Sequence, residues 1–360
     1  MNISKKKVIK IIALVLAVII GLIAILFGLL TITEYKPKDT ESLEVSGEAS
    51  KTLSRGDTIN LVTWNVGYCG LGEEADFFLD GGENVRSSNK ATVKDNLSSI
   101  AETTAALNPD VVFLQEVDVN SRRSYHINQY DAFTEALDGY SNTFATNYKS
   151  LFIPYPFPPI GKVNAGIATY SKYEISESTR VQLPCPFAYP ERLGNLKRCL
   201  VVNRVPIEDS DKELVLINLH LEAYASDEEK ATQTAVLKEY LDQEVEKGNY
   251  VIAGGDFNQI FSNIDSSAYP QISEDLWKPG YIDINDFSDE YKFVMDDQVP
   301  SCRSLDKPLA GNDSAANKFQ YYIIDGFIVS DNIMVQNVST QNLQFKNSDH
   351  NPLVMTVRLR

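Results

Sequence analysis

The chain has 360 residues, of which 43% are hydrophobic and 10% aromatic, so it can bury a sizeable core and differs from a disordered protein. Its length suits one large α/β domain or two ordinary ones. The formal net charge of −16 opposes long-range attraction to nucleic acids and anionic bilayers. This charge does not exclude a local basic groove or metal-assisted phosphate binding.

The N-terminus carries the first strong pattern. Residues 11–30 form an apolar run without a charged group, preceded by Lys5, Lys6, Lys7 and Lys10. About 20 apolar residues in a helix span a bilayer core of roughly 30 Å. The lysines favour a cytoplasmic N-terminus, which places the rest of the chain outside the cell.

A cleaved signal peptide is the alternative for this segment. Signal peptides have a shorter apolar core, followed by a cleavage site with small residues. Here the run ends in "TITEYKPK", which lacks such a site. The sequence therefore favours a retained signal anchor and a single-pass protein of the cell membrane.

Four regions follow from this interpretation. We expect a cytoplasmic tail over 1–10, a transmembrane anchor over 11–33, a flexible polar tether over 34–56 and one folded domain over 57–360. The part beyond the anchor has 29 basic and 49 acidic residues, a formal charge of −20. A monomer is expected.

The outer part alternates between patterns typical of strands and of helices. Helical spacing appears over 92–110, which ends at Asn-Pro, and over 228–248, which ends at a glycine. Strand patterns appear at 58–67, 111–117, 165–173, 213–221, 250–258, 320–330 and 352–360. Because helices separate some strands and short turns separate others, the sequence predicts an α/β domain with mixed sheets.

Two further features leave alternatives open. Residues 147–164 form a loop rich in aromatic residues and proline, which is either functional or a rigid connection between strands. The four cysteines include no CxxC pair, so a structural zinc site is not expected. Outside the cytoplasm they permit disulfides, with Cys185–Cys199 as a local candidate pair.

Polar side chains follow several apolar strands at the point where each strand ends. Burying such groups without partners is costly, and converging carboxylates imply a cation. Oxygen ligands without cysteine suit Mg²⁺, or alternatively Mn²⁺. Each residue taken singly also has an ordinary interpretation as a turn, capping or core residue. The set comprises Asn65, Glu116, His220, Asp256, Asn258, Asp349 and His350.

The order of these short motifs carries a resemblance. The series "TWNV", "LQEV", "NLHLE", "GGDFN", "IDGF" and "SDHNP" resembles the metal-dependent endonuclease/exonuclease/phosphatase superfamily over about residues 58–358. The resemblance implies a four-layer αββα sandwich of two mixed β-sheets. It also implies hydrolysis of phosphate esters with a divalent metal, and says much less about the substrate.

The resemblance also implies roles for the metal and for the attacking water. Glu116 is the principal metal ligand, supported by Asn65 and Asp349. Asp256 orients or deprotonates the water, and Asn258 holds a phosphate oxygen.

Two histidines complete the implied site. His220 donates a hydrogen bond to a phosphoryl oxygen, and His350 is a second catalytic histidine, oriented by Asp325. The sequence leaves open whether His350 or Asp256 is the general base.

Further residues match less strict patterns of the superfamily. Asn164, before "AGIATYSKY", corresponds to a position that touches phosphate. Arg122 and Arg123 either meet an anionic substrate or face water. Lys230 and Gln233 match an Arg-x-x-Gln spacing of several relatives, with a solvated helix face as the alternative.

The chain departs from the pattern of the superfamily in two places. Gly326 stands where many members have an aromatic residue, and the recognition segments of inositol phosphatases have no counterpart.

Three functional hypotheses follow. The first is a membrane-tethered Mg²⁺-dependent phosphoesterase acting outside the cell on a phosphodiester such as a lipid headgroup or a nucleotide. The second is a surface nuclease for extracellular DNA or RNA, which the net charge disfavours. The third is a non-catalytic binding module on the same fold, ranked last because the candidate catalytic residues are present.

Overall fold

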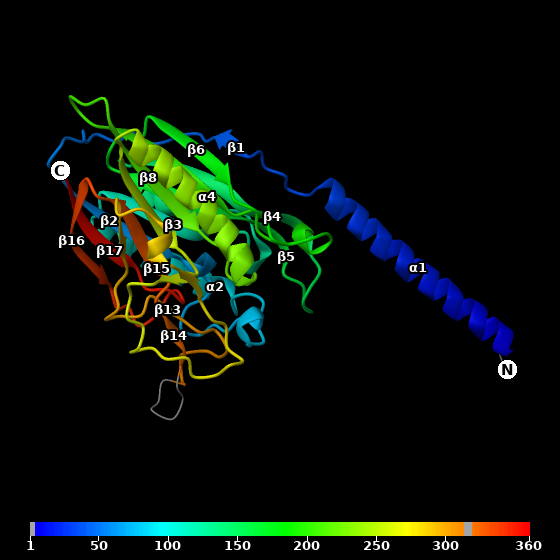
Figure 1. Cartoon of the computed structure of the whole chain (residues 1–360). Helices are drawn as coiled ribbons and strands as arrows, with labels where there is room; N and C mark the ends of the chain where they lie inside the picture. The colour runs from blue at the N-terminus through cyan, green and yellow to red at the C-terminus, as the bar shows by residue number, and fades with distance from the viewer. Residues whose placement is uncertain (1–3, 313–318) are drawn as a thin grey trace.

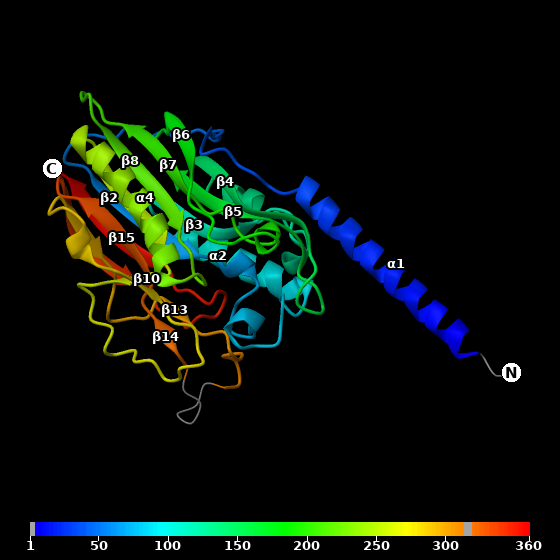
Figure 2. The ribbon, with the colours of Figure 1, turned by 45° about the vertical axis from the view of Figure 1, so that its right-hand side comes forward.

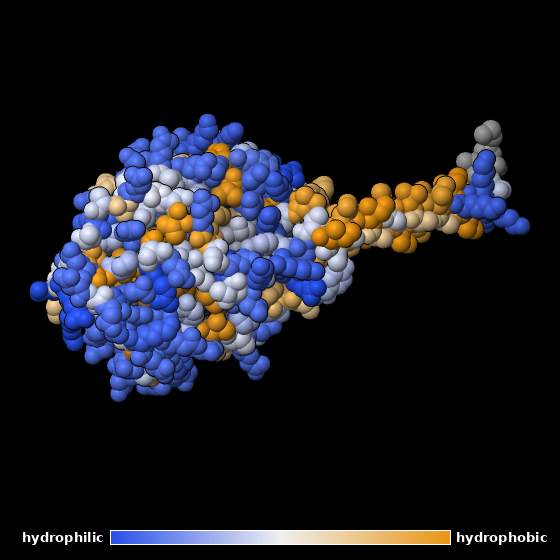
Figure 3. All heavy atoms as spheres, turned by 90° about the horizontal axis from the view of Figure 1, so that it is seen from above, coloured by the Kyte–Doolittle hydropathy of each residue, from blue (hydrophilic) through white to orange (hydrophobic). Residues whose placement is uncertain are grey.

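The computed structural model describes residues 4–312 and 319–360. A helix of 28 residues, α1 (Lys5–Ile32), projects away from the body of the protein (Figure 1). Among the described residues it is the one helix long and apolar enough to cross a membrane, and signal sequences share these properties. Its surface is apolar except near the N-terminal lysines (Figure 3). The apolar run 11–30 lies within this helix, and the predicted anchor, 11–33, ends one residue beyond it.

Strands dominate the body of the protein. They are β1 (Thr40–Ser42), β2 (Thr58–Asn65), β3 (Val111–Asp118), β4 (Ser141–Ile153), β5 (Gly161–Ser171), β6 (Glu177–Gln182), β7 (Cys199–Pro206), β8 (Glu213–His220), β9 (Tyr250–Asp256), β10 (Gln259–Phe261), β11 (Gly280–Ile282), β12 (Tyr291–Val294), β13 (Cys302–Arg303), β14 (Tyr321–Tyr322), β15 (Asp325–Ser330), β16 (Ile333–Thr340) and β17 (Leu353–Leu359).

Helices connect some of these strands. The α-helices of the body are α2 (Lys90–Ala106), α3 (Gln129–Ala136) and α4 (Asp227–Glu246). Short 3-10 turns are η1 (Gly67–Cys69), η2 (Phe78–Asp80), η3 (Arg122–Ser124), η4 (Glu191–Leu193) and η5 (Ile284–Asp286). The two predicted helices are therefore present, each ending a few residues earlier than expected.

The described strands form two main mixed sheets. One has the order β1-β6-β7-β8-β9-β15-β12, and the other has the order β16-β17-β2-β3-β5-β4. Parallel pairing joins β8 to β9 and β2 to β3, while their other neighbours in each sheet are antiparallel. This arrangement confirms the predicted mixed α/β architecture.

Alternating side chains explain why the two sheets pack face to face. Successive residues of a strand point to opposite faces, and β8 is apolar on both. Leu214 and Leu216 join the core between the sheets, whereas Val215 and Ile217 pack under α4. Figure 2 shows α4 lying over β8.

The second sheet follows the same rule. Ile59 and Leu61 of β2 face the inter-sheet core, and Trp64 faces the cluster that contains α2 and α3. The body is thus a sandwich with helix layers outside both sheets, as the resemblance implied.

The segment 34–56 differs from the predicted flexible tether. Its strand β1 pairs with β6, and isolated bridges join Ser46 to Asn142 and Leu53 to Ile207. Leu53 is buried in the inter-sheet core. The polar composition concealed this pairing because an edge strand needs main-chain hydrogen bonds more than apolar side chains.

The aromatic segment 147–164 also differs from a long loop. Most of it belongs to β4 and β5, which pair as a hairpin, and residues 154–160 form the connection at its tip. Cys69, Cys185, Cys199 and Cys302 all lie in the described part of the chain, and all are free thiols. The structure therefore does not contain the candidate Cys185–Cys199 disulfide.

Candidate active site

Several site residues continue the inward-facing rows of the inter-sheet core. Asn65 ends the row of Ile59 and Leu61, and His220 ends the row of Leu214 and Leu216. Asp256 ends β9, beside His220 in the strand register, and Asp325 begins the antiparallel β15 opposite Asp256. Since β15 runs the other way, its first residue lies at the same edge as the last residue of β9. This places polar groups from both sheets at one end of the sandwich.

Asp256 lies at the centre of this group. Its Oδ2 accepts a hydrogen bond from Nδ2 of Asn65 at 2.9 Å. The same oxygen lies 3.5 Å from Nε2 of His220 and 3.7 Å from Nε2 of His350. Burial raises the pKa of this carboxyl to about 7, with the charge of His350 opposing the shift and Asp325 adding to it.

His350 is held in one orientation. Its Nδ1 lies 2.8 Å from Oδ2 of Asp325, and its carbonyl accepts from the indole of Trp64 at 2.9 Å. Burial opposes a charge on the ring, but the Asp325 carboxylate more than offsets this, so the pKa of His350 lies well above its usual value. The remaining ring nitrogen, Nε2, faces Asp256.

His220 has the opposite character. Burial, together with the positive charges of Arg198 and His350, holds the pKa of His220 well below its usual value. Its Nδ1 is buried and has no hydrogen-bond partner within the described structure. The site therefore combines a neutral imidazole with a charged one.

Glu116 occupies a bulge in β3. The pairing of β3 with β5 shifts register between Leu114 and Val117, and Glu116 has a left-handed φ of 56°. A bulge re-aims the side chain that it carries, and strain of this kind concentrates at functional sites. Oε1 of Glu116 accepts from Nδ2 of Asn65 at 3.3 Å, and Oε2 lies 3.7 Å from Arg123.

The donor set fits a divalent cation. Burial raises the pKa of Asp349 to about 6, with the charge of His350 opposing the shift and the neighbouring charge of Glu116 adding to it. Two carboxylates that disfavour each other's charge in a buried site are stabilised by a cation between them. Carboxylate oxygens suit Mg²⁺ or Mn²⁺, so Glu116 and Asp349 are the residues that would hold it.

Asn65 differs from the metal ligand that the resemblance implied. Its Oδ1 accepts a hydrogen bond from the backbone of Gly67 at 3.0 Å, and its Nδ2 points at the two carboxylates. An amide nitrogen donates hydrogen bonds and does not ligate a cation. In this arrangement Asn65 positions Glu116 and Asp256.

Asn258 lies in the site as expected. Its backbone N–H donates to Asp256 Oδ1, and its Nδ2 donates to the carbonyl of Leu221, each at 2.9 Å. An amide carries two N–H groups, so one remains for a ligand. Asn258 lines the same cavity as Asp256 and both site histidines.

Asn164 does not line this cavity, whereas its neighbour Ala165 does. The Asn164 Oδ1 is buried without a partner in the described structure. Its contact with phosphate stays a prediction.

Arg122 and Arg123 differ in their position relative to the cavity. Arg123 is buried, donates to Asp118 at 3.0 Å and stacks over the ring of Tyr68 at 4.0 Å, in the wall of the cavity. Arg122 donates to the carbonyl of Pro159 at 3.5 Å and does not line the cavity. The predicted substrate contact therefore has a structural basis for Arg123 and none for Arg122.

The cavity over these groups has a volume of about 150 Å³. The polar groups around Asp256 line it together with several large apolar side chains. This combination is typical of a site that binds a small polar group attached to an apolar or aromatic body. The wall includes Leu71, Phe77, Ile160, Phe187, Leu196 and Trp277.

Comparison with known proteins settles the family. The family model described as "Endonuclease/Exonuclease/phosphatase family" matches residues 62–350, well over half of the chain. The chain belongs to this family. Members usually hydrolyse phosphate esters and generally depend on a divalent metal. A search of curated protein sequences found no match.

Solved structures support the fold. An endonuclease/exonuclease/phosphatase from Beutenbergia cavernae is 20% identical with a TM-score of 0.55, covering 84% of this chain and 72% of that one. One from Bacteroides vulgatus is 16% identical with a TM-score of 0.52, covering 84% and 100%. A humanized D. rerio TDP2 is 13% identical with a TM-score of 0.51, covering 84% and 99%. Similarity at this identity confirms the shared fold alone.

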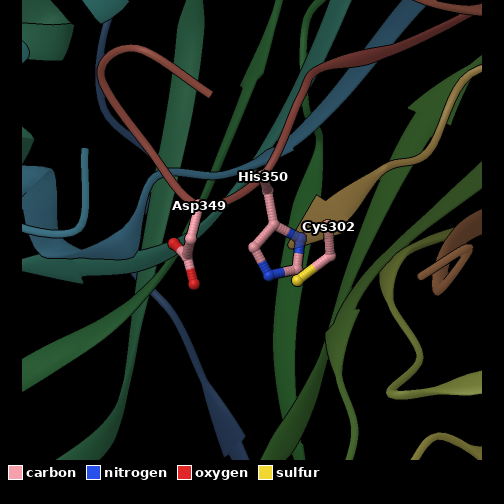
Figure 4. A group of neighbouring side chains, drawn as sticks. All are labelled: Cys302, Asp349 and His350. Carbon is pink, nitrogen blue, oxygen red and sulfur yellow. The ribbon is translucent and has the colours of Figure 1, made fainter. Parts of the chain in front are cut away.

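Family motifs did not reveal every residue of the site. Cys302 of β13 lies beside the His350 ring, and ligand atoms of Cys302, Asp349 and His350 all lie within 4.8 Å of one another (Figure 4). Burial raises the pKa of this thiol to about 12, so it remains protonated. A cysteine in a two-residue strand carries no sequence signal for this position.

Two further residues line the cavity, Asp80 at the end of η2 and Tyr224 in the loop before α4. The Tyr224 hydroxyl donates to Asp80 Oδ1 at 3.3 Å. Burial raises the pKa of Asp80 to about 7, and the nearby Asp349 adds to the shift. No strand or helix pattern marks either residue.

A buried ion pair supports the end of β8. Arg198 donates to Glu222 at 3.1 Å and to the carbonyl of His220 at 3.2 Å. Gln233 of α4 accepts from the Glu222 backbone at 3.0 Å and donates to Pro184 at 2.8 Å. The interpretation of Gln233 as part of a solvated helix face is therefore wrong. In the sequence, Glu222 was marked only by its position two residues after His220, the last residue of β8.

Proposed function

We propose that the protein is a divalent-metal-dependent phosphodiester hydrolase. The convergence of Asn65, His220 and His350 on one carboxylate oxygen of Asp256 carries this proposal. Glu116 and Asp349 lie beside that cluster and repel each other's charge. Phosphoester hydrolysis needs charge neutralisation, a positioned water and donors for the phosphoryl oxygens, and the site contains groups for each.

Glu116 and Asp349 would hold the cation, Mg²⁺ or alternatively Mn²⁺, which neutralises charge on the phosphate when bound. Asn65 keeps Glu116 and Asp256 in place through its amide hydrogens. These residues form the metal side of the site.

Asp256 would orient the attacking water and accept its proton. Among the described residues, it is the one carboxylate within 4 Å of both site histidines. His350 already donates from Nδ1 to Asp325, so its Nε2–H is free to bind a phosphoryl oxygen. His220 and the second N–H of Asn258 would bind the other oxygens.

The protein is further proposed to remain tethered through α1, with the folded domain outside the cell. The cluster of lysines before α1 supports this orientation. Buried Leu30 and the ion pair of Glu34 with Arg192 at 3.2 Å tie the end of the helix to the body, which favours a retained anchor. The substrate is a phosphodiester of a lipid headgroup or a nucleotide, and a monomer suffices because one chain supplies the whole site.

Hydrolysis by the full-length chain in detergent micelles tests the activity. We expect turnover of bis-p-nitrophenyl phosphate with Mg²⁺ or Mn²⁺, its loss in EDTA, and a roughly 10²–10⁴-fold lower rate for Asp256→Asn. His126→Ala is the matched control, because that histidine is exposed and contacts Asn120 outside the cavity. Parallel assays on phospholipids, DNA and RNA separate a lipid hydrolase from a surface nuclease. Full turnover in EDTA, or an active Asp256→Asn, would refute the proposal.

A further inference from the structure

A group of large apolar side chains is exposed near the C-terminal end of α1. Leu151, Tyr155 and Phe157 lie at the tip of the β4–β5 hairpin, where they are 52%, 71% and 97% exposed. Tyr189, in the loop before β7, is 52% exposed. We call these four residues the apolar tip. An exposed apolar cluster of this kind in a soluble body marks an interaction surface.

The apolar tip lies next to the proposed membrane anchor. The Thr31 hydroxyl at the end of α1 lies 3.4 Å from the hydroxyl of Tyr189. Tyr35, just beyond the helix, donates to the carbonyl of Thr146 in β4. Figures 1 and 2 show the β4–β5 hairpin on the side of the body from which α1 projects. A bilayer around α1 would therefore meet the apolar tip first.

We propose that the apolar tip inserts into the surface of the bilayer that α1 spans and presents the cavity to phosphate esters of membrane lipids. The insertion rests on the proposed anchoring through α1. The choice of lipid substrates rests on the proposed phosphodiesterase activity.

The chemistry of the tip suits a bilayer interface. Tyrosine rings concentrate where hydrocarbon meets headgroups, and phenylalanine and leucine gain from burial in the acyl region. Residues 147–164 include Lys149 and Lys162 and no acidic residue, in an outer part with a formal charge of −20. A local excess of lysine favours contact with anionic headgroups.

The tip is continuous with the rim of the cavity. Ile160 of the hairpin and Phe187 of the loop before β7 both line the cavity. The ring of Tyr155 packs edge-on against Phe78, with centroids 6.1 Å apart, and the chain neighbours of Phe78, Phe77 and Leu79, line the cavity. Insertion of the tip would thus bring the cavity mouth to the headgroup layer.

Tryptophan quenching in membranes tests the insertion directly. The full-length chain carrying Phe157→Trp is reconstituted in vesicles of phosphatidylcholine and phosphatidylglycerol, with and without brominated acyl chains. We expect quenching of the added indole and blue-shifted emission. Tyr281→Trp is the matched control, since Tyr281 is 62% exposed on β11 and does not line the cavity. Trp64 and Trp277 give the same background in each variant and are subtracted.

The control should emit as a water-exposed indole without quenching. Leu151→Trp is a second reporter on the tip and should behave as Phe157→Trp. If both tip reporters match the Tyr281→Trp control, the insertion is refuted.

An activity measurement tests the consequence for the substrate. Phe157→Ser should lower turnover of vesicle phospholipid roughly tenfold, because it removes one aromatic side chain that would be buried in the bilayer. Turnover of bis-p-nitrophenyl phosphate should stay unchanged. An equal effect on both substrates would refute lipid presentation by the tip. If the wild type hydrolyses neither substrate, the phosphodiesterase proposal fails, while the quenching result still decides the insertion.

Discussion

His350 Nδ1 lies 2.8 Å from Asp325 Oδ2, with both side chains buried at the end of the inter-sheet core. Asp325 begins β15 of one sheet, and His350 precedes β17 of the other. The pair therefore depends on the packing of the two sheets, and it orients the ring whose Nε2 faces Asp256.

Asp325→Asn should lower kcat roughly 10²–10⁴-fold on bis-p-nitrophenyl phosphate, with a much smaller change in KM. The asparagine keeps the shape but no longer holds the ring in its charged, oriented form. Steady-state kinetics of the full chain in detergent measure both constants. Asp331→Asn is the control, because its ion pair with Lys292 lies at the opposite end of β15 from Asp325, and neither residue lines the cavity. Equal kcat for the two variants would contradict the role of Asp325.

Glu116→Gln should weaken Mn²⁺ binding by roughly a hundredfold or more, because the neutral amide removes one of the two charges that attract the cation. Isothermal titration of the metal-free full chain with Mn²⁺ measures this without relying on activity. Glu228→Gln, a change on the exposed start of α4, serves as the comparison and should bind as the wild type does. Unchanged affinity in Glu116→Gln would place the metal elsewhere.

Removing residues 349–360 should abolish folding as well as activity. The strand β17 pairs with β16 on one side and β2 on the other, so its loss divides a sheet. Thermal melting followed by circular dichroism should show no cooperative transition. His350→Ala separates the two effects, since it should melt cooperatively and still lack activity. A truncated chain with a wild-type melting curve would show that β17 is dispensable.

Glu244→Gln should lower the free energy of unfolding by about 1.5–3 kcal/mol at neutral pH. Oε1 of Glu244 lies 2.6 Å from Arg204 and 2.7 Å from Lys247. Burial raises the pKa of Glu244, but hydrogen bonds from Arg204, Lys247 and Asn249 more than offset this and hold it below its usual value.

The stability that Glu244 contributes depends on pH. A carboxyl whose pKa is lower in the folded state adds stability above its unfolded pKa, about 4.3, and loses it as the pH falls through the folded value. The stability gap between wild type and Glu244→Gln should therefore close as acid is added below about pH 4.3. Glu274→Gln, which breaks an exposed pair with Lys278, should cost at most about 1 kcal/mol. A gap that widens in acid would contradict the assignment.

Much of the fold follows from local patterns. Alternating and continuous apolar runs predicted β2, β3, β8, β9 and β17, and the capping box of Ser226 and Glu229 marks where α4 begins. The polar residues that end these strands were found for the same reason, because a charged side chain after a buried strand needs a partner. The family and its fold are confirmed, while the roles of the individual residues stay predictions.

Local patterns failed where pairing or orientation comes from distant segments. Nothing in residues 34–56 indicates that β1 would pair with β6, because main-chain hydrogen bonds leave little trace in side-chain composition. The orientation of the Asn65 amide, with its nitrogen toward Glu116 and Asp256, depends on the hydrogen bond that the backbone N–H of Gly67 donates to its Oδ1.

By itself, the sequence determined the helix long enough to cross a membrane, the order of the motifs along the chain and the set of polar groups that must find partners. These depend on side-chain chemistry and on the periods of helices and strands. Only the tertiary structure decided that Asn65, His220 and His350 converge on one carboxylate oxygen of Asp256. The same holds for the position of the hairpin tip beside α1. Such contacts join residues far apart in the chain, and the packing of two twisted sheets sets their distances.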